Sequence, residues 1–332
     1  MNKKRSSIIF IAVGLLLIIA SIIILILPSS SDKNNSSDGN EENKKVPSTP
    51  LLYEVSKEGS ENKIYLFGSI HVADDRAYPL PNAVMNAYKS SDYLAVEFDL
   101  IAYEEDLEAQ MNSLKILLCD EGQTVKDLLK SDTYDKMVSY LKENKVYNSI
   151  YDSYKPVLFY SLITNIQAEK SELDSTKGID MYFLNQAKED KKEILEVESS
   201  DYQYKMLSSF PNELFDFLIT YSIENDALSI VSTKQLYETW LKGNEQELAA
   251  LLGNGSNEDY SYEGYDNLEE IMKNYENVLV TQRNNEMTDK AEGYFNEGKN
   301  VFFVVGAAHI VGDDALVDLL TERGYSVKKV NY

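Results

Sequence analysis

Two apolar runs near opposite ends of the chain constrain its fold most. One is KIYLFGS, residues 63–69, and the other is VFFVVG, residues 301–306. Both are rich in β-branched and aromatic residues and contain a glycine at or near their end, which is typical of buried strands. Because the long sequence between these runs has mainly helical periodicity, strands at both ends predict one α/β sheet.

Other segments have the composition of further strands or helices. LLYEVS forms a hairpin with the run at 63–69, across the turn formers of KEGSEN. Further strands are predicted at 93–99, 192–198 and 325–330, and helices at 82–90, 125–130, 179–188, 291–297 and 313–323. The sequence therefore predicts a central mixed β-sheet with flanking helices and a mainly helical middle insertion, roughly 101–290, in a domain spanning 51–332.

The N-terminus carries a different signal. Lys3, Lys4 and Arg5 precede an apolar run at 8–27. At about 1.5 Å per residue this run matches the ~30 Å core of a bilayer. It is too long for a signal peptide, and the exit ILPS is a poor cleavage site. We expect a transmembrane helix at 8–27, after a short cytoplasmic stretch at 1–7.

The basic flank places the rest of the protein outside the cell membrane as a single-pass protein with an extracellular C-terminal domain. Residues 28–50 are polar and lack periodicity, so we predict a disordered tether. The net charge of −23 argues against nucleic acid as a partner. Cys119 is the only cysteine, which excludes an intrachain disulfide and leaves stability to the core or to a metal.

The only two histidines stand in the same local setting. His71 and His309 each follow a glycine by three positions, Gly68 and Gly306, although glycine makes up only 15 of 332 residues. Ligands of open α/β sheets bind beyond the carboxyl ends of the strands, and a glycine there permits close approach of other groups. We therefore expect both imidazoles to point to one edge of the sheet.

A pair of imidazoles indicates a metal site or acid-base chemistry, and a metal would require an anionic third ligand. Glu97 ends the apolar strand YLAVEFD, where a buried carboxylate is costly unless it is paired or binds a cation. Glu196 and Glu198 stand at i and i+2, on one face of a predicted strand. Asp180 and Arg283 are further candidates, although on spacing alone a helix cap and a solvated arginine explain them better.

These segments resemble the TraB/GumN family, which includes the Tiki-type membrane-tethered metalloproteases. The likeness covers nearly all of 51–332 and depends on the order of LFGSIHV, SDYLAVEFD, KGIDMYF, EVESSDYQ, RNNEMTDKAEGYF and VVGAAHIVGDD. The resemblance implies an α/β architecture like that of erythromycin esterases and ChaN, and a centre made of His71, His309 and Glu97. Other family-type positions are Asp180, Glu196, Glu198, Gln203, Arg283 and Asn284.

The predicted function is a membrane-anchored, extracytoplasmic metal-dependent hydrolase acting on a peptide or protein substrate. A divalent metal ion (Mn, Co or Zn) would be held by His71, His309 and Glu97. Glu196 or Glu198 would act as general base, and Arg283 would stabilise the oxyanion. Gly68, Gly306, Asp180 and Asn284 would support the site.

Two other functions are compatible with the same residues. The family's pheromone-shutdown members suggest a non-catalytic protein that binds and sequesters a secreted peptide. Two histidines and a carboxylate also match an iron oxygenase triad, but an extracytoplasmic location away from reduced iron disfavours it.

Overall fold

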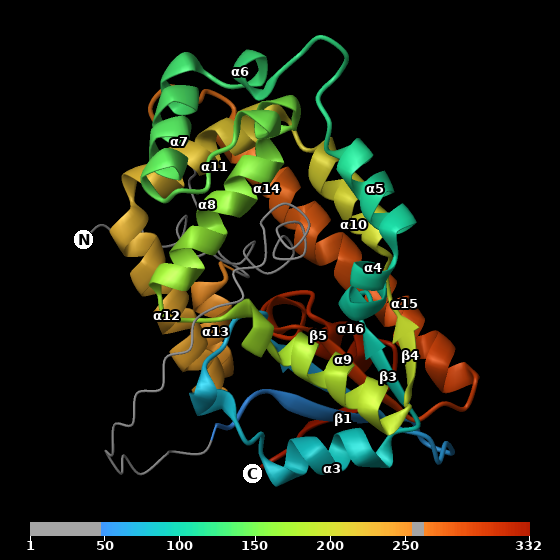
Figure 1. Ribbon diagram of the computed structural model, residues 1–332. Helices are drawn as coiled ribbons and strands as arrows, with labels where there is room; N and C mark the ends of the chain where they lie inside the picture. The colour runs from blue at the N-terminus through green and yellow to red at the C-terminus, as the bar shows by residue number, and fades with distance from the viewer. Residues whose placement is uncertain (1–47, 254–261) are drawn as a thin grey trace.

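The computed structural model describes residues 48–253 and 262–332 (Figure 1). The predicted anchor at 8–27 and nearly all of the predicted tether at 28–50 lie outside the described residues. Within the described residues, no helix is both long and apolar enough to cross a membrane.

A six-stranded mixed sheet organises the described chain, in the order β4-β3-β5-β2-β1-β6. The strands are β1 Leu52–Ser56, β2 Ile64–Ser69, β3 Tyr93–Val96, β4 Glu193–Glu196, β5 Val301–Gly306 and β6 Ser326–Lys329. β4, β3, β5 and β2 run parallel, whereas β1 pairs antiparallel with both β2 and β6. The predicted α/β class with a mixed sheet is confirmed.

The parallel strands are buried as their composition requires. All six residues of β5, at the centre of the sheet, are buried. Phe302 of β5 packs against both Phe67 of β2 and Phe183, with ring centroids 5.6 and 4.8 Å away. The predicted hairpin of β1 and β2 is present, with Leu52 opposite Phe67.

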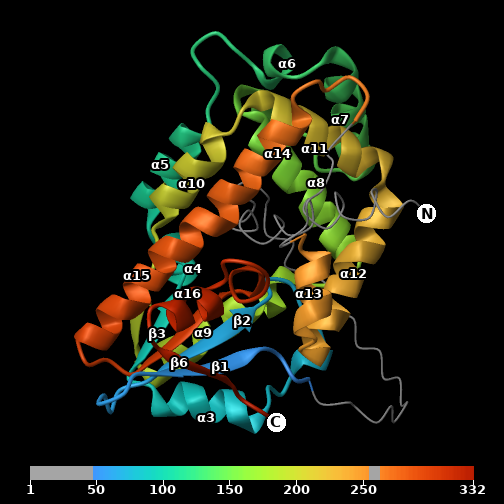
Figure 2. The same cartoon turned by 180° about the vertical axis from the view of Figure 1, so that it is seen from behind.

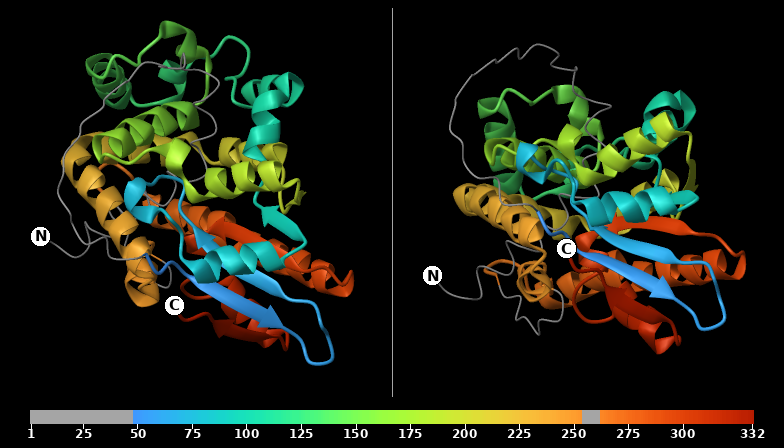
Figure 3. Two further views of the ribbon diagram at one scale, coloured as in Figure 1. Left: turned by 60° about the horizontal axis from the view of Figure 1, so that its bottom comes forward. Right: turned by 90° about the horizontal axis from the view of Figure 1, so that it is seen from below.

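Helices cover both faces of the sheet (Figures 2 and 3). On one face lie α3 (Asn82–Ser90) and α9 (Ile179–Asp190), and on the other lie α15 (Arg283–Asn296) and α16 (Leu316–Glu322). α9 ends where Lys191 takes the left-handed conformation, and α16 is followed by Gly324 at a φ of 86°. This arrangement leaves the carboxyl ends of the parallel strands to be covered by other helices.

Two helical segments stand over that edge of the sheet (Figure 1). The first, between β3 and α9, contains α4 Leu100–Glu105, α5 Leu107–Ile116, α6 Val125–Leu128, α7 Ser131–Glu143 and α8 Pro156–Lys170. The second, between β4 and α15, contains α10 Ser200–Ser209, α11 Asn212–Glu224, α12 Asp226–Lys242, α13 Glu245–Leu251 and α14 Leu268–Glu276. The segments pack together through α8, α7 and α11 and through α5 and α10. The predicted helical insertion, roughly 101–290, is thus divided in two by α9, which covers the sheet, and by strand β4.

Strands β3 and β4 end earlier than their apolar pattern suggests. β3 ends at Val96, because Asp99 caps α4 by accepting a hydrogen bond from the backbone N–H of Ala102 at 3.0 Å. β4 ends at Glu196, and Ser199 caps α10 in the same way. Glu97 therefore directly follows the end of β3, and Glu198 lies two residues beyond the end of β4.

Candidate functional site

Three of the predicted site residues converge where the parallel strands end. His71 follows β2, His309 ends the 3₁₀-helix η5 (Ala307–His309) that follows β5, and Glu97 follows β3 directly. A side chain placed on Gly306 would begin 3.4 Å from Glu97 Oε1, 3.9 Å from His71 Nε2 and 3.8 Å from His309 Cδ2. The lack of a side chain at Gly306 therefore leaves a cradle that all three residues face.

His309 is fixed through its δ-nitrogen. Nδ1 lies 2.7 Å from Oδ1 of Asn284, whose Nδ2 donates to the carbonyl of Asp314 at 2.8 Å. Because the amide is oriented by that donation, Asn284 accepts from Nδ1–H, and Nε2 keeps its lone pair. Burial, reinforced by the charge of Arg283, lowers the pKa of His309 to about 3. His309 is therefore neutral at physiological pH.

His71 is held by a carboxylate. Its Nδ1 lies 2.5 Å from Oδ2 of Asp180, and the hydroxyl of Ser69 donates to the other carboxylate oxygen at 2.7 Å. Burial lowers the pKa of His71, but the charge and hydrogen bond of Asp180 outweigh it and raise the pKa above its usual value. Its side chain is 16% exposed and that of His309 only 5%, so solvent reaches the site from the His71 side.

Gly178 permits the approach of α9 to His71. A side chain on Gly178 would begin 2.4 Å from the carbonyl oxygen of His71. The next residue, Ile179, donates its N–H to the carbonyl of Ile70 at 2.9 Å. Helix α9 therefore starts against the backbone of the histidine loop, which places Asp180, in its first turn, beside the imidazole.

Glu97 is ionised and held on both oxygens. Oε1 accepts the backbone N–H of Gly306 at 2.9 Å, and Oε2 accepts from Arg283 Nη2 at 2.6 Å and Gln203 Nε2 at 3.1 Å. Burial raises the pKa of Glu97, but the charges of Arg283, His309 and His71 outweigh it and hold the pKa well below its usual range. The carboxylate thus carries a negative charge inside the protein.

Arg283 joins Glu97 to a second carboxylate behind the cradle. Its Nε and Nη2 donate to Glu198 at 2.7 and 2.9 Å, and Nη1 donates to the carbonyl of Leu279 at 3.2 Å. Gln203 bridges the same two carboxylates, with 2.7 Å to Glu198. The guanidinium has no exposed surface, and burial, which lowers its pKa, is outweighed by Glu198 and Glu97. The interpretation of Arg283 as a solvated arginine is therefore excluded. Its guanidinium donates to the two carboxylates and to Leu279, and not into the cradle.

The structure does not bring Glu196 to this cluster. Glu196 is exposed, and its Oε1 accepts the backbone N–H of Asp99 at 2.8 Å, which steadies the turn after β3. The i, i+2 rule that grouped it with Glu198 applies only within a strand, and β4 ends at Glu196 itself. Only Glu198 therefore reaches the interior.

Gly68 serves close packing. A side chain there would begin 3.4 Å from Cα of Ala307, so β2 and the turn after β5 are in contact at this point. Ser69 and Gly178 belong to the site but were not predicted as site residues. Their signals were local, since Ser69 lies inside the Gly68–His71 motif and Gly178 directly precedes the helix that carries Asp180.

The donors suit a divalent cation in kind and direction. With each Nδ1 engaged by Asp180 or Asn284, both imidazoles present Nε2, which is how metal-binding histidines are commonly oriented. His309 Nε2 lies 4.0 Å from Glu97 Oε1. Within residues 48–253 and 262–332, no group of three or more His, Cys, Asp or Glu side chains could hold an ion as it stands.

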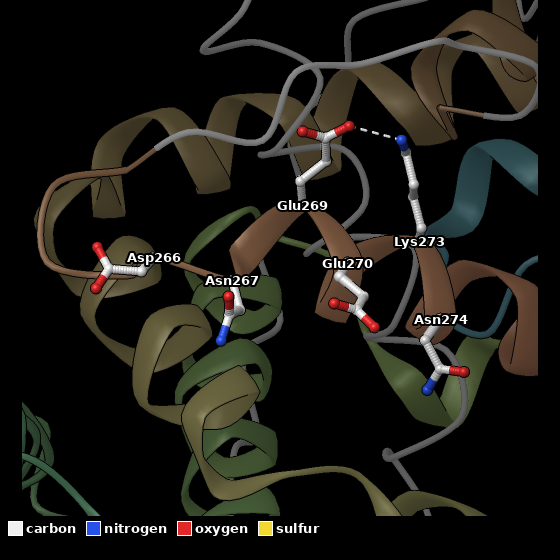
Figure 4. Close-up of a pocket in the computed structure, with 6 residues that line it drawn as sticks. All are labelled: Asp266, Asn267, Glu269, Glu270, Lys273 and Asn274. Atoms are coloured by element: carbon white, nitrogen blue, oxygen red, sulfur yellow. Dashed lines mark hydrogen bonds and ion pairs between the residues drawn. The ribbon is translucent and has the colours of Figure 1, made fainter.

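A surface pocket at the start of α14 is a separate feature (Figure 4). It is lined by Asp266, Asn267, Glu269, Glu270, Lys273 and Asn274. Lys273 pairs with Glu269 at 2.6 Å. No histidine lines this pocket, and it is separate from the site of His71, His309 and Glu97 at the end of the parallel strands.

The fold and the site define a class of α/β protein in which two histidines and a glutamate meet beyond the carboxyl ends of parallel strands. The chain belongs to the TraB/PrgY/gumN family, whose model matches residues 51–329. No solved structure matches the chain significantly.

Three relatives resemble the chain at low sequence identity. A "Metalloprotease TIKI homolog" of Nematostella vectensis is 22% identical over 80% of this chain and 64% of its own length. "Metalloprotease TIKI1" of Danio rerio is 21% identical over 80% of this chain and 60% of its own length. The "Uncharacterized protein YbaP" of Escherichia coli (strain K12) is 25% identical over 77% of this chain and 87% of its own length.

Proposed function

We propose that the protein is a membrane-anchored, extracytoplasmic metal-dependent hydrolase that cleaves peptide bonds. The observation that carries the proposal is the convergence of His71, His309 and Glu97 on the cradle at Gly306. Metalloprotease names among distant relatives support a hydrolase, and the apolar run at 8–27 behind three basic residues supports an anchor.

His71 and His309, through Nε2, and Glu97, through Oε1, would hold the cation. When bound, a divalent cation lowers the pKa of water and polarises a carbonyl group. Asp180 and Asn284 hold the two imidazoles with Nε2 toward the cradle. The greater exposure of His71 makes its side the entry for a substrate.

Arg283 and Glu198 have a different role from the one that their spacing first suggested. Arg283 has no exposed surface and donates to two carboxylates, so we assign it to holding Glu97 charged and oriented in place of stabilising an oxyanion. Glu198 has both oxygens engaged by Arg283 and Gln203, which leaves it unsuited to act as general base. Glu196 is exposed and its Oε1 accepts the backbone N–H of Asp99, so we assign it to the turn after β3 and not to that role.

The test is cleavage of a peptide library by the full-length protein in detergent, read by mass spectrometry. We expect new peptide ends that a chelator abolishes and that added Mn²⁺, Co²⁺ or Zn²⁺ restores. The double variant His71→Ala, His309→Ala serves as the control and should be inactive. Peptides retained intact by a fully metal-loaded protein would contradict the proposal and favour sequestration of a peptide.

The anchor has its own test. Protease added to intact cells should digest the domain at 51–332 while leaving cytoplasmic proteins untouched. Protection of that domain until the membrane is broken would contradict the proposed topology.

A further inference from the structure

Helix α12, from the second helical segment, forms hydrogen bonds to the loop that carries His71. The indole Nε1 of Trp240 donates to the carbonyl of Gly68 at 2.8 Å. The hydroxyl of Tyr237 donates to Asp74 Oδ1 at 2.8 Å and lies 3.2 Å from the backbone nitrogen of Asp74, which donates to it. The two contacts therefore stand three residues before and three residues after His71.

The two side chains that form these hydrogen bonds are themselves immobilised. Tyr237 and Trp240 have no exposed surface, and their rings stack with centroids 6.3 Å apart and planes at 10°. The backbone N–H of Gly68 donates to the carbonyl of Leu51, directly before β1, at 3.0 Å. The indole of Trp240 thus adds a side-chain hydrogen bond to the carbonyl of the same residue, at the end of β2.

The loop that carries His71 is also packed closely against the start of α9. The His71 carbonyl lies against Gly178, at a position that any side chain there would occupy, and Asp174 exchanges backbone hydrogen bonds with Ala73 at 2.9 and 3.1 Å. Because the loop that carries His71 cannot move closer to α9, we infer that its hydrogen bonds to Trp240 and Tyr237 of α12 keep it from moving away. A shift of about 1 Å at a reacting group can cost ~10²-fold in rate.

We propose that Trp240 and Tyr237 are positioning residues that set the place of the His71 imidazole. The proposal deepens the proposed function and rests on it for the meaning of the site, but the first of its two readouts requires neither metal nor activity. The variants Trp240→Phe and Tyr237→Phe each remove one donor and keep a buried ring. Tyr140→Phe is the matched control, because Tyr140 donates to Asp226 at 2.5 Å in the same helical layer without touching the histidine loop.

The first readout uses the two histidines of the chain. Selective ¹⁵N-histidine labelling of the full chain, without a histidine tag, gives two sets of imidazole NMR signals, assigned with His71→Ala. We expect Trp240→Phe and Tyr237→Phe to move the His71 signals and to leave those of His309 in place. Tyr140→Phe should move neither, at a comparable loss of thermal stability.

The second readout is the affinity for Zn²⁺ or Co²⁺, measured by chelator competition. Groups that orient a metal-binding histidine typically change affinity by ~10–100-fold, and we expect that loss in the two loop variants and not in Tyr140→Phe. Wild-type protein that binds no metal would contradict the proposed function and leave the NMR comparison valid. Unmoved His71 signals in both variants, or unchanged metal affinity in a metal-binding protein, would overturn the positioning proposal.

Discussion

At the scale of single residues, the site depends on the space that Gly306 leaves open. Its φ of −50° is open to any residue, and a Cβ alone would make ordinary van der Waals contacts of 3.4 to 3.9 Å, so it is a larger side chain that the space excludes. The atoms that would surround a side chain belong to Glu97, His309 and His71. Replacing Gly306 would therefore place carbon where the three functional groups meet.

Gly306→Val tests this requirement. We expect loss of metal binding and hydrolysis, because the added methyl groups fill the cradle and displace His309 and Glu97. Gly293→Ala is the control, since Gly293 lies within α15 with nothing within 4 Å of an added side chain. Isothermal titration with Zn²⁺ and thermal melts of both variants give the answer. Full metal binding by Gly306→Val would refute the role of the cradle.

The buried guanidinium of Arg283 offers a second test at the same scale. Arg283→Met leaves Glu97 and Glu198 buried without their partner, which should cost about 3–5 kcal/mol of unfolding free energy. Arg323→Met is the comparison, because Arg323 forms partly exposed pairs with Asp289 and Glu292 and should cost no more than about 1 kcal/mol. Urea denaturation measures both. Equal losses would show that Arg283 does not compensate the buried carboxylates.

At the scale of elements, the start of α9 against the His71 loop is the tightest junction of the site. Gly178→Ala forces a methyl group to within 2.4 Å of the His71 carbonyl, so the helix must move away. We expect ~1–3 kcal/mol of destabilisation together with weaker metal binding, because Asp180 moves with the helix. The comparison variant is again Gly293→Ala. A stable Gly178→Ala protein with wild-type metal affinity would mean that the junction is looser than its backbone contacts indicate.

The elements also separate what the sequence could predict from what it could not. β5 and β2 followed from apolar runs, because strands buried on both faces leave a local signal in composition. The early ends of β3 and β4 depend on caps at Asp99 and Ser199, which outweighed the apolar pattern. Buried Arg283 could not be predicted, since its partners lie 85 and 186 positions away in the sequence.

At the scale of the whole molecule, the site links stability to pH through His309. The folded protein binds the His309 proton only near pH 3, whereas the unfolded chain binds it near pH 6.5. Acidification below pH 6.5 therefore favours the unfolded state, and the free energy of unfolding falls progressively toward pH 3. Between pH 7 and pH 5 this decrease in the free energy of unfolding amounts to about 2 kcal/mol.

Denaturation of the metal-free protein at pH 7 and pH 5 checks this linkage against His309→Gln. The raised pKa of His71 acts with the opposite sign, stabilising below its unfolded pKa, and the lowered pKa of Glu97 removes stability on acidification. Both groups are present in either protein, so the difference reports His309 together with its effect on the pKa of Glu97. We expect His309→Gln to lose less stability on acidification than wild type. Identical losses would indicate that His309 is protonated in the folded protein.

The central claim is that His71, His309 and Glu97 hold one divalent cation. The most direct measurement is the metal content of the full chain, purified in detergent and saturated with Zn²⁺, Co²⁺ or Mn²⁺ in turn, for wild type and for His71→Ala, His309→Ala and Glu97→Ala. We expect one ion per wild-type chain for at least one of the metals, and its loss in each variant that remains folded by thermal melt. One ion per chain in the His71→Ala, His309→Ala double variant, or none in wild type with any of the three metals, would contradict it.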